Sequence, residues 1–354
     1  MKFNWRTKTS VGIDLGNRTV KALQLKKKAD KVILDKHFFY DLANANPSFP
    51  AVSNLGSTLA GLVEVAGFKN LATSSCIDDS EVVRFDLSFP NIPKNEVAEA
   101  VKGEVEQRIH FPIDEASIEY KIITDPEKPT DDVINVKAFC TRLASIRSQI
   151  QLLEKASLRP ESIDIAMLAN ISTLAFNSYL EDDSFSVVID LGETRTSIAL
   201  LQGRTHLLSN IIQTAFGTIN RRLAESMSLN YMQAEEIKLR ISQAQGEEQT
   251  EVSNIIEAVY LDLFRQLQKS MEFFKASTSG KSISRIYLIG GGSRFTSIAT
   301  TISSIFELET ILVNPFRNIE IFEKDKQNTE QIGLIASHLT TVVGLALRGL
   351  NVGV

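Results

Sequence analysis

Two stretches of the sequence place an aspartate and a glycine in the same pattern, and that pattern could bind a polyphosphate. Residues 11–19 read VGIDLGNRT and residues 188–196 read VIDLGETRT. In each, an apolar run ends on Asp14 or Asp190, a glycine follows two residues later, and the chain returns to an apolar run. This is typical of a β-hairpin with a carboxylate and a glycine turn at its tip. Two such hairpins predict two similar half-domains that face each other across a cleft.

The chemistry that fits this pair is the binding of a polyphosphate together with a metal ion. A carboxylate repels phosphate unless a cation lies between them, and Mg²⁺ retains several waters and needs few protein oxygens. We therefore expect Asp14 and Asp190 to hold Mg²⁺ through water, while Lys21 reaches a phosphate as a point charge. Backbone N–H groups of the turns would face phosphate oxygens. The turn residues expected at the ligand are Gly16, Asn17, Arg18, Thr19, Gly192, Glu193 and Thr194. One such hairpin alone would be an ordinary tight turn, and the matched pair favours the phosphate site.

Two further motifs have residue types that contact a nucleoside. A predicted buried strand runs into a turn made of Gly290, Gly291, Gly292 and Ser293. A helix follows, so a flat base or a ribose could approach this backbone closely. Glu235 and Lys238 lie on one face of a predicted helix and could bracket a ribose, although their spacing alone is more typical of a solvated ion pair. A Rossmann dinucleotide site is rejected, because it needs G-x-G-x-x-G after the first strand and Asp14 occupies that place.

Composition predicts a soluble protein of two or more domains in a reducing compartment. With 354 residues the chain is too long for one core. Its 43% hydrophobic and 23% charged residues are ordinary for a globular protein, and a net charge of −5 argues against nucleic acid as the main partner. Cys76 and Cys140 make no disulfide framework. The polar start predicts no signal peptide, and the apolar residues 339–350 predict a core helix in place of a membrane anchor.

The predicted elements form two β-rich halves, each with an insert. The insert of the first half runs from about residue 76 to 154, with the order strand, helix, strand, strand and then a further helix. In the second half, residues 219–276 are predicted to be helical and highly charged. Polar connectors are predicted at 44–53, 125–132 and 243–250.

These motifs, in this order and over nearly the whole chain, resemble those of the actin-like ATPase superfamily. Residues 11–21 resemble its phosphate-1 hairpin, with a lysine at the phosphate-binding position, and residues 188–196 resemble phosphate-2. Residues 286–293 resemble the adenosine motif. Glu235 and Lys238 match the E-x-x-K contact to the nucleoside.

Within the superfamily, the sequence is most similar to the PilM family of type IV pilus assembly proteins. The order of elements in the first insert resembles subdomain 1C of PilM and FtsA proteins. Residues 109–115, IHFPIDE, are similar to a PilM segment with the pattern IPFPIDE. Residues 343–349, VGLALRG, resemble the PilM ending, and residues 270–274, SMEFF, resemble one of its helices.

The resemblance implies an actin-like two-lobed α/β fold of duplicated ribonuclease-H-like domains, with an inserted 1C module and a helical 2B insert. The expected subdomain boundaries are 1–75, 155–182 and 339–354 for 1A, 76–154 for 1C, 183–217 and 281–338 for 2A, and 218–280 for 2B.

The resemblance also implies a cytoplasmic ATP-binding scaffold of the pilus inner-membrane platform, with ATP and Mg²⁺ as cofactors. PilM-like proteins bind the cytoplasmic N-terminal peptide of the membrane protein PilN in a groove between 1A and 1C, and residues 85–111 hold candidates to line it. Domain closure would relay the nucleotide state. Pilus motor ATPases, the platform protein and self-association are further expected contacts. The chain would be peripheral to the inner membrane through its partner, without inserting into the membrane directly.

Hydrolysis is expected to be slow or absent, so the chain is at most a slow ATPase. In hydrolytic relatives a Gln or Glu after the small insert positions the attacking water, and residues 163–170 offer neither. Arg18 and Thr19 also replace the small serines common in the first hairpin. No catalytic residue is assigned.

Three alternatives remain open at this point. A small-molecule kinase of the same superfamily would need a carboxylate base, for which Asp78, Asp79 and Asp86 are candidates. An FtsA-like filament would carry a basic amphipathic C-terminal helix. A GspL-like secretion component would continue into a membrane-spanning helix.

Overall fold

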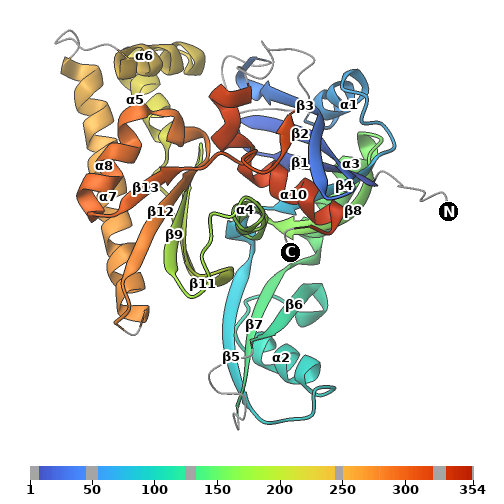
Figure 1. Cartoon of the computed structure of the whole chain (residues 1–354). Coiled ribbons are helices and arrows are strands. Elements are labelled where there is room, and N and C mark those ends of the chain that lie inside the picture. Colours follow the sequence, from blue (N-terminus) through green and yellow to red (C-terminus); the bar gives the residue numbers. More distant parts are fainter. Residues whose placement is uncertain are drawn as a thin grey trace.

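Two lobes lie side by side, and a smaller module projects from them (Figure 1). The computed structural model describes residues 8–44, 55–123, 133–243, 250–278, 280–321 and 332–352. The connectors predicted at 44–53, 125–132 and 243–250 lie largely outside these residues.

The first lobe is built on a six-stranded sheet with the order β14-β3-β2-β1-β4-β8. Its strands are β1 (Lys8–Leu15), β2 (Thr19–Lys28), β3 (Lys31–Asp41), β4 (Ala72–Ile77), β8 (Arg159–Ile165) and β14 (Glu320–Ile321). Strands β1 to β3 form an antiparallel meander, whereas β4 runs parallel to β1 and β8 runs parallel to β4. The carboxyl ends of β1, β4 and β8 therefore lie at one edge of the sheet.

Helices cover both faces of this sheet because its strands alternate apolar residues between the faces. These helices are α1 (Leu55–Val65), α3 (Leu143–Lys155), α4 (Ala166–Phe176) and α10 (Thr340–Leu350). On one face Val11 packs in a cluster with Leu59 of α1 and Leu153 of α3. On the other face Leu23 packs with Val342 of α10.

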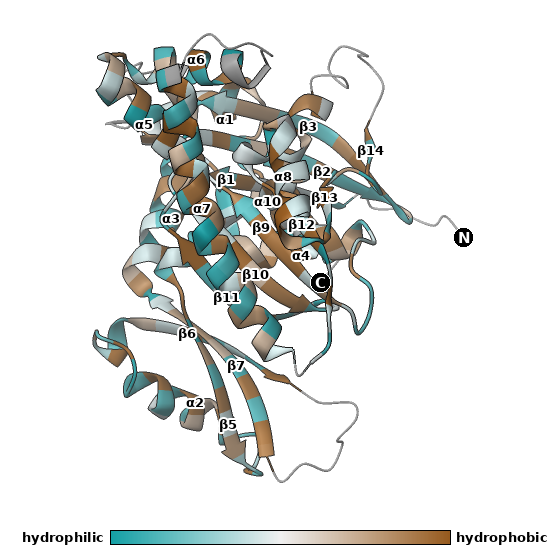
Figure 2. Cartoon of the chain, turned by 90° about the vertical axis from the view of Figure 1, so that its left-hand side faces the viewer, coloured by the Kyte–Doolittle hydropathy of each residue, from teal (hydrophilic) through white to brown (hydrophobic). Residues whose placement is uncertain are grey.

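The second lobe is built on a five-stranded sheet with the order β11-β10-β9-β12-β13. Its strands are β9 (Phe185–Leu191), β10 (Thr196–Gln202), β11 (Thr205–Ile212), β12 (Ile283–Ile289) and β13 (Glu309–Leu312). The central strands β9 and β12 are almost entirely buried and predominantly hydrophobic, as expected for strands covered on both faces (Figure 2).

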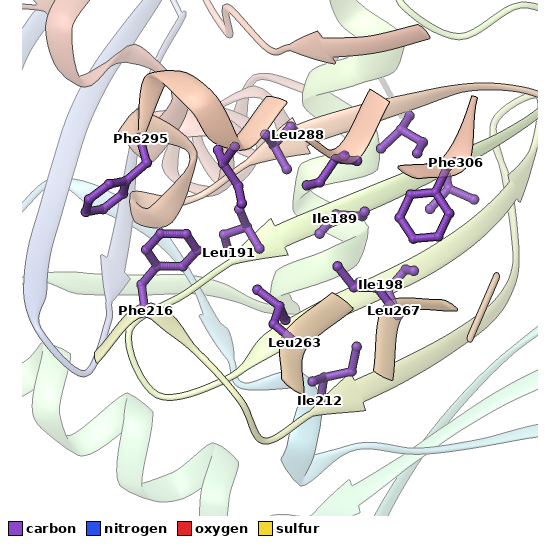
Figure 3. Packing of buried hydrophobic residues seen from close by; sticks show 14 of the residues in the cluster. Ile189, Leu191, Ile198, Ile212, Phe216, Leu263, Leu267, Leu288, Phe295 and Phe306 are labelled. Carbon is purple, nitrogen blue, oxygen red and sulfur yellow. The ribbon is translucent and has the colours of Figure 1, made fainter. Parts of the chain in front are cut away.

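Helices of the second lobe complete its core. They are α5 (Phe216–Met227), α6 (Tyr231–Gln243), α7 (Thr250–Ser277) and α8 (Thr296–Phe306). Leu263 and Leu267 of α7 pack with Ile198 and Leu288 on one face of the sheet (Figure 3). On the opposite face α4 packs against the sheet, so this helix contacts both lobes.

The projecting module is a three-stranded antiparallel sheet with one helix. Its elements are β5 (Val83–Pro90), α2 (Val97–Glu106), β6 (Ala116–Ile123) and β7 (Val133–Arg142), in the sheet order β5-β7-β6. Val97, Val101 and Val105 of α2 are fully buried against the sheet. The strand, helix, strand, strand order predicted from the sequence is therefore present.

The packing favours three shifts in the predicted subdomain boundaries, which otherwise remain predictions. Helix α3, expected in the module, packs on the first sheet through Leu153, and β4 at the expected start of the module belongs to that same sheet. Near the other boundary, β14 pairs with β3 and Phe316 packs with Leu23, so the chain returns to the first lobe well before residue 338.

The C-terminal helix lies in the core of the first lobe. The helical stretch Ile332–Leu350 is long and apolar enough to cross a membrane, but 61% of it is buried within the structure. A Cβ on Gly344 would lie 1.9 Å from the Ala169 carbonyl oxygen, and one on Gly12 would lie 2.2 Å from the Val342 carbonyl oxygen. The helix thus contacts α4 and β1 at backbone distance, where only glycine fits.

Candidate functional site

Strand ends from both sheets meet at one interlobe cleft. Ile13 of β1 pairs with Ser75 of the parallel strand β4, and Asp190 of β9 pairs with Ile289 of the parallel strand β12. The segments that follow these strands all line the cleft. Of the residues predicted from the sequence, the cleft is lined by Asp14, Gly16, Asn17, Arg18, Thr19, Lys21, Asp190, Gly192, Glu193, Thr194, Glu235, Lys238, Gly290, Gly291 and Gly292.

The first hairpin presents a carboxylate and an ammonium group side by side. Asp14 and Lys21 face each other across β1 and β2, and Lys21 Nζ lies 2.6 Å from Asp14 Oδ2. Burial by itself would lower the pKa of Lys21, but Asp14 and Asp190 outweigh it and raise that pKa, so the lysine is charged. The turn closes with the Gly16 N–H donating to the Thr19 carbonyl at 3.0 Å.

The second hairpin brings Asp190 against the glycine turn. Gly290 has φ +86°, and a Cβ there would lie 2.2 Å from Asp190 Oδ1, so this position requires glycine. Asn170 Nδ2 donates to Asp190 Oδ2 at 3.4 Å. Burial raises the pKa of Asp190 to about 7, Asp14 and Asp79 add to the rise, and Lys21 opposes it. This part of the cleft therefore has more carboxylate charge than its lysine neutralises.

A cation would relieve this excess negative charge. Among the described residues no group of three or more His, Cys, Asp or Glu side chains is arranged to coordinate a metal. Phosphate and water would thus supply most ligands of an ion held near Asp14 and Asp190, which is how Mg²⁺ is usually bound with a nucleotide. The donor set fits a water-bridged Mg²⁺.

Glu235 and Lys238 form a buried pair at the opposite side of the cleft. Their charged atoms lie 2.6 Å apart, and the Lys238 side chain is only 2% exposed. The Asn220 amide donates to Glu235 at 2.6 Å. Burial alone would raise the pKa of Glu235, but Lys238 and Arg18 lower it to about 2. The interpretation of this pair as a solvated surface ion pair is therefore wrong.

Arg18 connects the first hairpin to the second lobe. Its guanidinium donates to Asp41 at 2.9 Å in the first lobe and lies 2.9 Å from Glu235 Oε2 in α6. It also lies 3.8 Å from Glu193 in the second turn. Asn17 makes a second connection by donating to Thr194 Oγ1 at 2.7 Å. The turns that would face phosphate are thus already linked to the facing lobe.

Ser293 is the predicted residue that does not line the cleft and instead supports the glycine turn. Its hydroxyl donates to the Gly290 carbonyl at 2.6 Å and lies 2.8 Å from the Ser337 hydroxyl. It therefore fixes the shape of the turn from behind. Gly292 is fixed by Phe216, whose Cδ2 would be 2.4 Å from a Cβ at that position.

Sequence reasoning named Asp78 and Asp79 only as candidate bases of a kinase and did not place them in the cleft, and it did not name His338. Asp78 and Asp79 come directly after β4, and His338 lies in the 3₁₀ turn that precedes α10. Burial raises the pKa of Asp79 to about 6, although Arg84 lies 2.5 Å away. Asp86, the third candidate base, lies in the module and pairs with Lys137.

Comparison with known structures shows that the chain has the fold of the actin-like ATPases. A chain of a structure described as a PilM–PilN type IV pilus biogenesis complex matches with a TM-score of 0.82 and 23% identity, over 96% of this chain and 98% of that one. MreB5 of Spiroplasma citri bound to ADP matches with a TM-score of 0.50 and 11% identity, over 95% of this chain and 94% of that one. The two-lobed actin-like fold predicted from the sequence is confirmed.

The sequence itself defines the family. The family model described as type IV pilus assembly protein PilM matches residues 12–350. The chain belongs to this family, as the sequence motifs predicted.

Proposed function

We propose that the interlobe cleft binds ATP with Mg²⁺ and that the protein is a cytoplasmic scaffold of the pilus assembly platform. The observation that carries the proposal is that the cleft gathers both aspartate hairpins, the buried Glu235–Lys238 pair and the glycine turn from separate elements. Asp14 and Asp190 would hold Mg²⁺ through water, and Lys21 would face phosphate. When bound, Mg²⁺ neutralises phosphate charge. The glycine turn lines the same cleft, and a nucleoside would lie beside its backbone.

The binding of ATP is tested by calorimetry with and without Mg²⁺. Asp14→Asn and Asp190→Asn should each weaken the binding of Mg²⁺–ATP by roughly tenfold or more, since each removes a charged partner of the ion. Asp86→Asn is the matched control, because Asp86 pairs with Lys137 in the module, and its affinity should equal that of the wild type. The metal role is wrong if both cleft variants bind ATP like the control, and wild-type protein that fails to bind ATP refutes the whole proposal.

The proposed partner is the cytoplasmic N-terminal peptide of a PilN-like membrane protein. Support comes from the structural match to a chain in a complex with PilN and from family membership. In the module, Phe85, Leu87 and Phe89 are buried in its own core, so they are not available to a peptide. Of the expected segment, Ile109 and Phe111 pack against that core but are only partly buried.

Binding of this peptide would place the chain at the cytoplasmic side of the inner membrane. Calorimetry with the partner's N-terminal peptide in the presence of ATP should give a saturable interaction, which Phe111→Ala weakens. Leu334→Ala is the control, since this 72% exposed side chain lies outside the module. The absence of binding by the wild type contradicts the partner proposal. Motor ATPases, the platform protein and self-association are further proposed contacts.

The nucleotide state would reach the module through a contact at its base. Arg195 in the second turn donates to Asp78 Oδ1 at 2.5 Å and to the Ser80 hydroxyl. Asp78 and Ser80 belong to the connection between β4 and β5. A ligand that moves the second turn would therefore pull directly on the first strand of the module.

The cleft fits a protein that binds ATP and hydrolyses it slowly or not at all better than it fits a small-molecule kinase. At the position expected to orient water, α4 begins with Ala166. Asp78 is paired with Arg195 and Asp79 with Arg84, so neither is a free base. An assay of ATP turnover with added metabolites should show no stimulation, and substrate-dependent turnover would favour the kinase.

A further inference from the structure

The hairpin between β2 and β3 concentrates lysines at the end of the first sheet that lies opposite the cleft. Residues 26–28 are all lysines and end β2, Lys31 begins β3, and Lys8 begins β1 beside them. Because β1 runs from Lys8 toward Asp14 at the cleft, six residues of strand separate its two ends by about 20 Å. We call these five lysines the basic hairpin, and none of them lines the cleft.

Four lysines of the basic hairpin form two like-charge pairs across the strands. Lys8 is the cross-strand partner of Lys27, and Lys28 is the partner of Lys31. Like charges at directly opposite positions destabilise a sheet. The fold gains nothing from these pairs, which indicates that the cations serve a ligand outside the chain.

Nearby carboxylates neutralise only part of this charge. Lys26 lies 2.7 Å from Asp35, Lys31 lies 2.5 Å from Glu320, and Asp30 is in the turn of the hairpin. Five lysines with three carboxylates leave this end of the sheet positive, although the whole chain has a net charge of −5. The charge of the protein is therefore distributed asymmetrically.

The remaining three lysines are available to a ligand. Lys8, Lys27 and Lys28 have no ion-pair partner within the part of the chain that the structure describes, and Lys8 and Lys28 are exposed. In the sequence, residues 1–7 read MKFNWRT, which adds two cations and two aromatic residues directly before Lys8. Cations next to Trp or Phe are typical of segments that contact a membrane interface.

The arrangement fits a broad anionic surface better than a shaped pocket. Successive residues of a strand point to opposite faces, so residues 26–28 present ammonium groups on both faces of the hairpin. A lysine is a point charge on a flexible stem and needs no fixed partner geometry. The headgroups of anionic phospholipids form such a surface, and each lysine close to it strengthens binding by about fivefold.

We propose that the basic hairpin contacts the anionic headgroups of the membrane and so orients the first lobe with its cleft away from the bilayer. This inference rests on the proposed function, in which a peptide of a membrane protein holds the chain beside the membrane. Such a tether raises the effective concentration of headgroups at the hairpin, so a weak contact is sufficient. An acidic protein is the competing ligand.

The test measures how the full chain sediments with lipid vesicles, without peptide or nucleotide. Vesicles of pure phosphatidylcholine are compared with vesicles that contain roughly one-third phosphatidylglycerol, whose headgroup is anionic. The wild type should bind the anionic vesicles at about 0.1 M salt and lose most of this binding at about 1 M, because salt screens exposed charges. The double variant Lys8→Glu with Lys28→Glu should bind them about 25-fold more weakly, since each lysine contributes about fivefold.

These substitutions should leave the fold intact. Each one converts a like-charge pair into an ion pair, with Lys27 or with Lys31, so the thermal stability should equal or exceed that of the wild type. The matched control is Lys94→Glu with Lys102→Glu, which makes the same change of charge at two exposed lysines of the module. The control should bind anionic vesicles like the wild type.

Three results overturn the inference: equal binding of the wild type to both kinds of vesicle, equal losses in the hairpin variant and the control, or stronger binding to soluble poly-L-glutamate than to the anionic vesicles per negative charge. The last result assigns the basic hairpin to an acidic protein. Calorimetry without vesicles should give the hairpin variant the affinities of the wild type for ATP and for the peptide. A failure of the proposed function is therefore seen separately, as wild-type protein that binds neither.

Discussion

The Arg195 contact at the base of the module should transmit the nucleotide state to the module, which we propose binds the partner's peptide. Arg195 and Asp78 are 27% and 38% exposed in their side chains, so solvent screens the 2.5 Å pair and it is worth about 1 kcal/mol. A coupling of that size changes an affinity by about fivefold. The measured quantity is the ratio of the peptide's dissociation constants without and with Mg²⁺–ATP. In the Arg195→Gln variant this ratio should be closer to one than in the wild type, by a factor of up to about five.

The assay is calorimetry with the partner's N-terminal peptide, with and without Mg²⁺–ATP. Asp78→Asn should reduce the ratio similarly, and the double variant should add little, because both substitutions remove one contact. Arg285→Gln is the matched control: Arg285 is equally exposed at 27% and lies 2.8 Å from Glu181 within the second lobe. Transmission through this contact is refuted if the ratio of dissociation constants is the same in Arg195→Gln, in the wild type and in the control.

Two further predictions concern stability. Gly344→Ala should lower the free energy of unfolding, measured by chemical denaturation, by about 3 kcal/mol, because its Cβ would overlap the Ala169 carbonyl. In the control Gly103→Ala in α2, the new Cβ meets no atom within 4 Å, so the change should be neutral or stabilising by about 0.5–1 kcal/mol. Equal effects of the two substitutions would contradict the close contact of α10 with α4. The pKa of Asp79 is raised to about 6 from an ordinary 3.8. Between pH 3.8 and pH 6, Asp79 is therefore protonated in the folded state and ionised in the unfolded state. Stability from this group is therefore full below pH 3.8 and is lost as the pH rises through 6, by on the order of 3 kcal/mol. Denaturation of wild-type and Asp79→Asn protein between pH 4 and pH 7.5 should show the wild type losing this amount relative to the variant, and parallel curves would disprove the shift.

The features that sequence predicted correctly are those encoded locally. A hairpin with an aspartate before a glycine turn needs only adjacent residues, and both predicted hairpins are present as antiparallel strand pairs. The strand before Gly290 was equally visible, because residues 286–289 of β12 form a continuous apolar run.

Strand β4 escaped prediction because its buried residues are small and polar. Thr73, Ser74 and Ser75 are all fully buried, and Ser75 donates to the Ile13 carbonyl at 2.9 Å. Hydropathy patterns cannot show such a strand, since its side chains are satisfied by tertiary hydrogen bonds. Asp78 and Asp79 could not be assigned to the cleft for the same reason, because their place follows from the end of β4.

The network around Arg18 was invisible for a different reason: its partners are distant in sequence. The departure from a small serine was evident at this position, but its consequence was not. The arginine reaches Asp41 in its own lobe and Glu235 in α6, and these distances arise only when the two lobes are assembled.

That assembly bears on what a nucleotide can do in this protein. The contacts Asn17–Thr194, Arg18–Glu235 and Arg195–Asp78 already join the lobes through side chains of the two turns. A ligand shifts a conformational equilibrium only by the difference in its affinity for the two states. Since the protein's own contacts already join the lobes in this arrangement, a bound nucleotide would change it only by what its phosphates add beyond these contacts. A cleft of this kind suits a bound nucleotide that reinforces a scaffold better than one that drives repeated opening by hydrolysis.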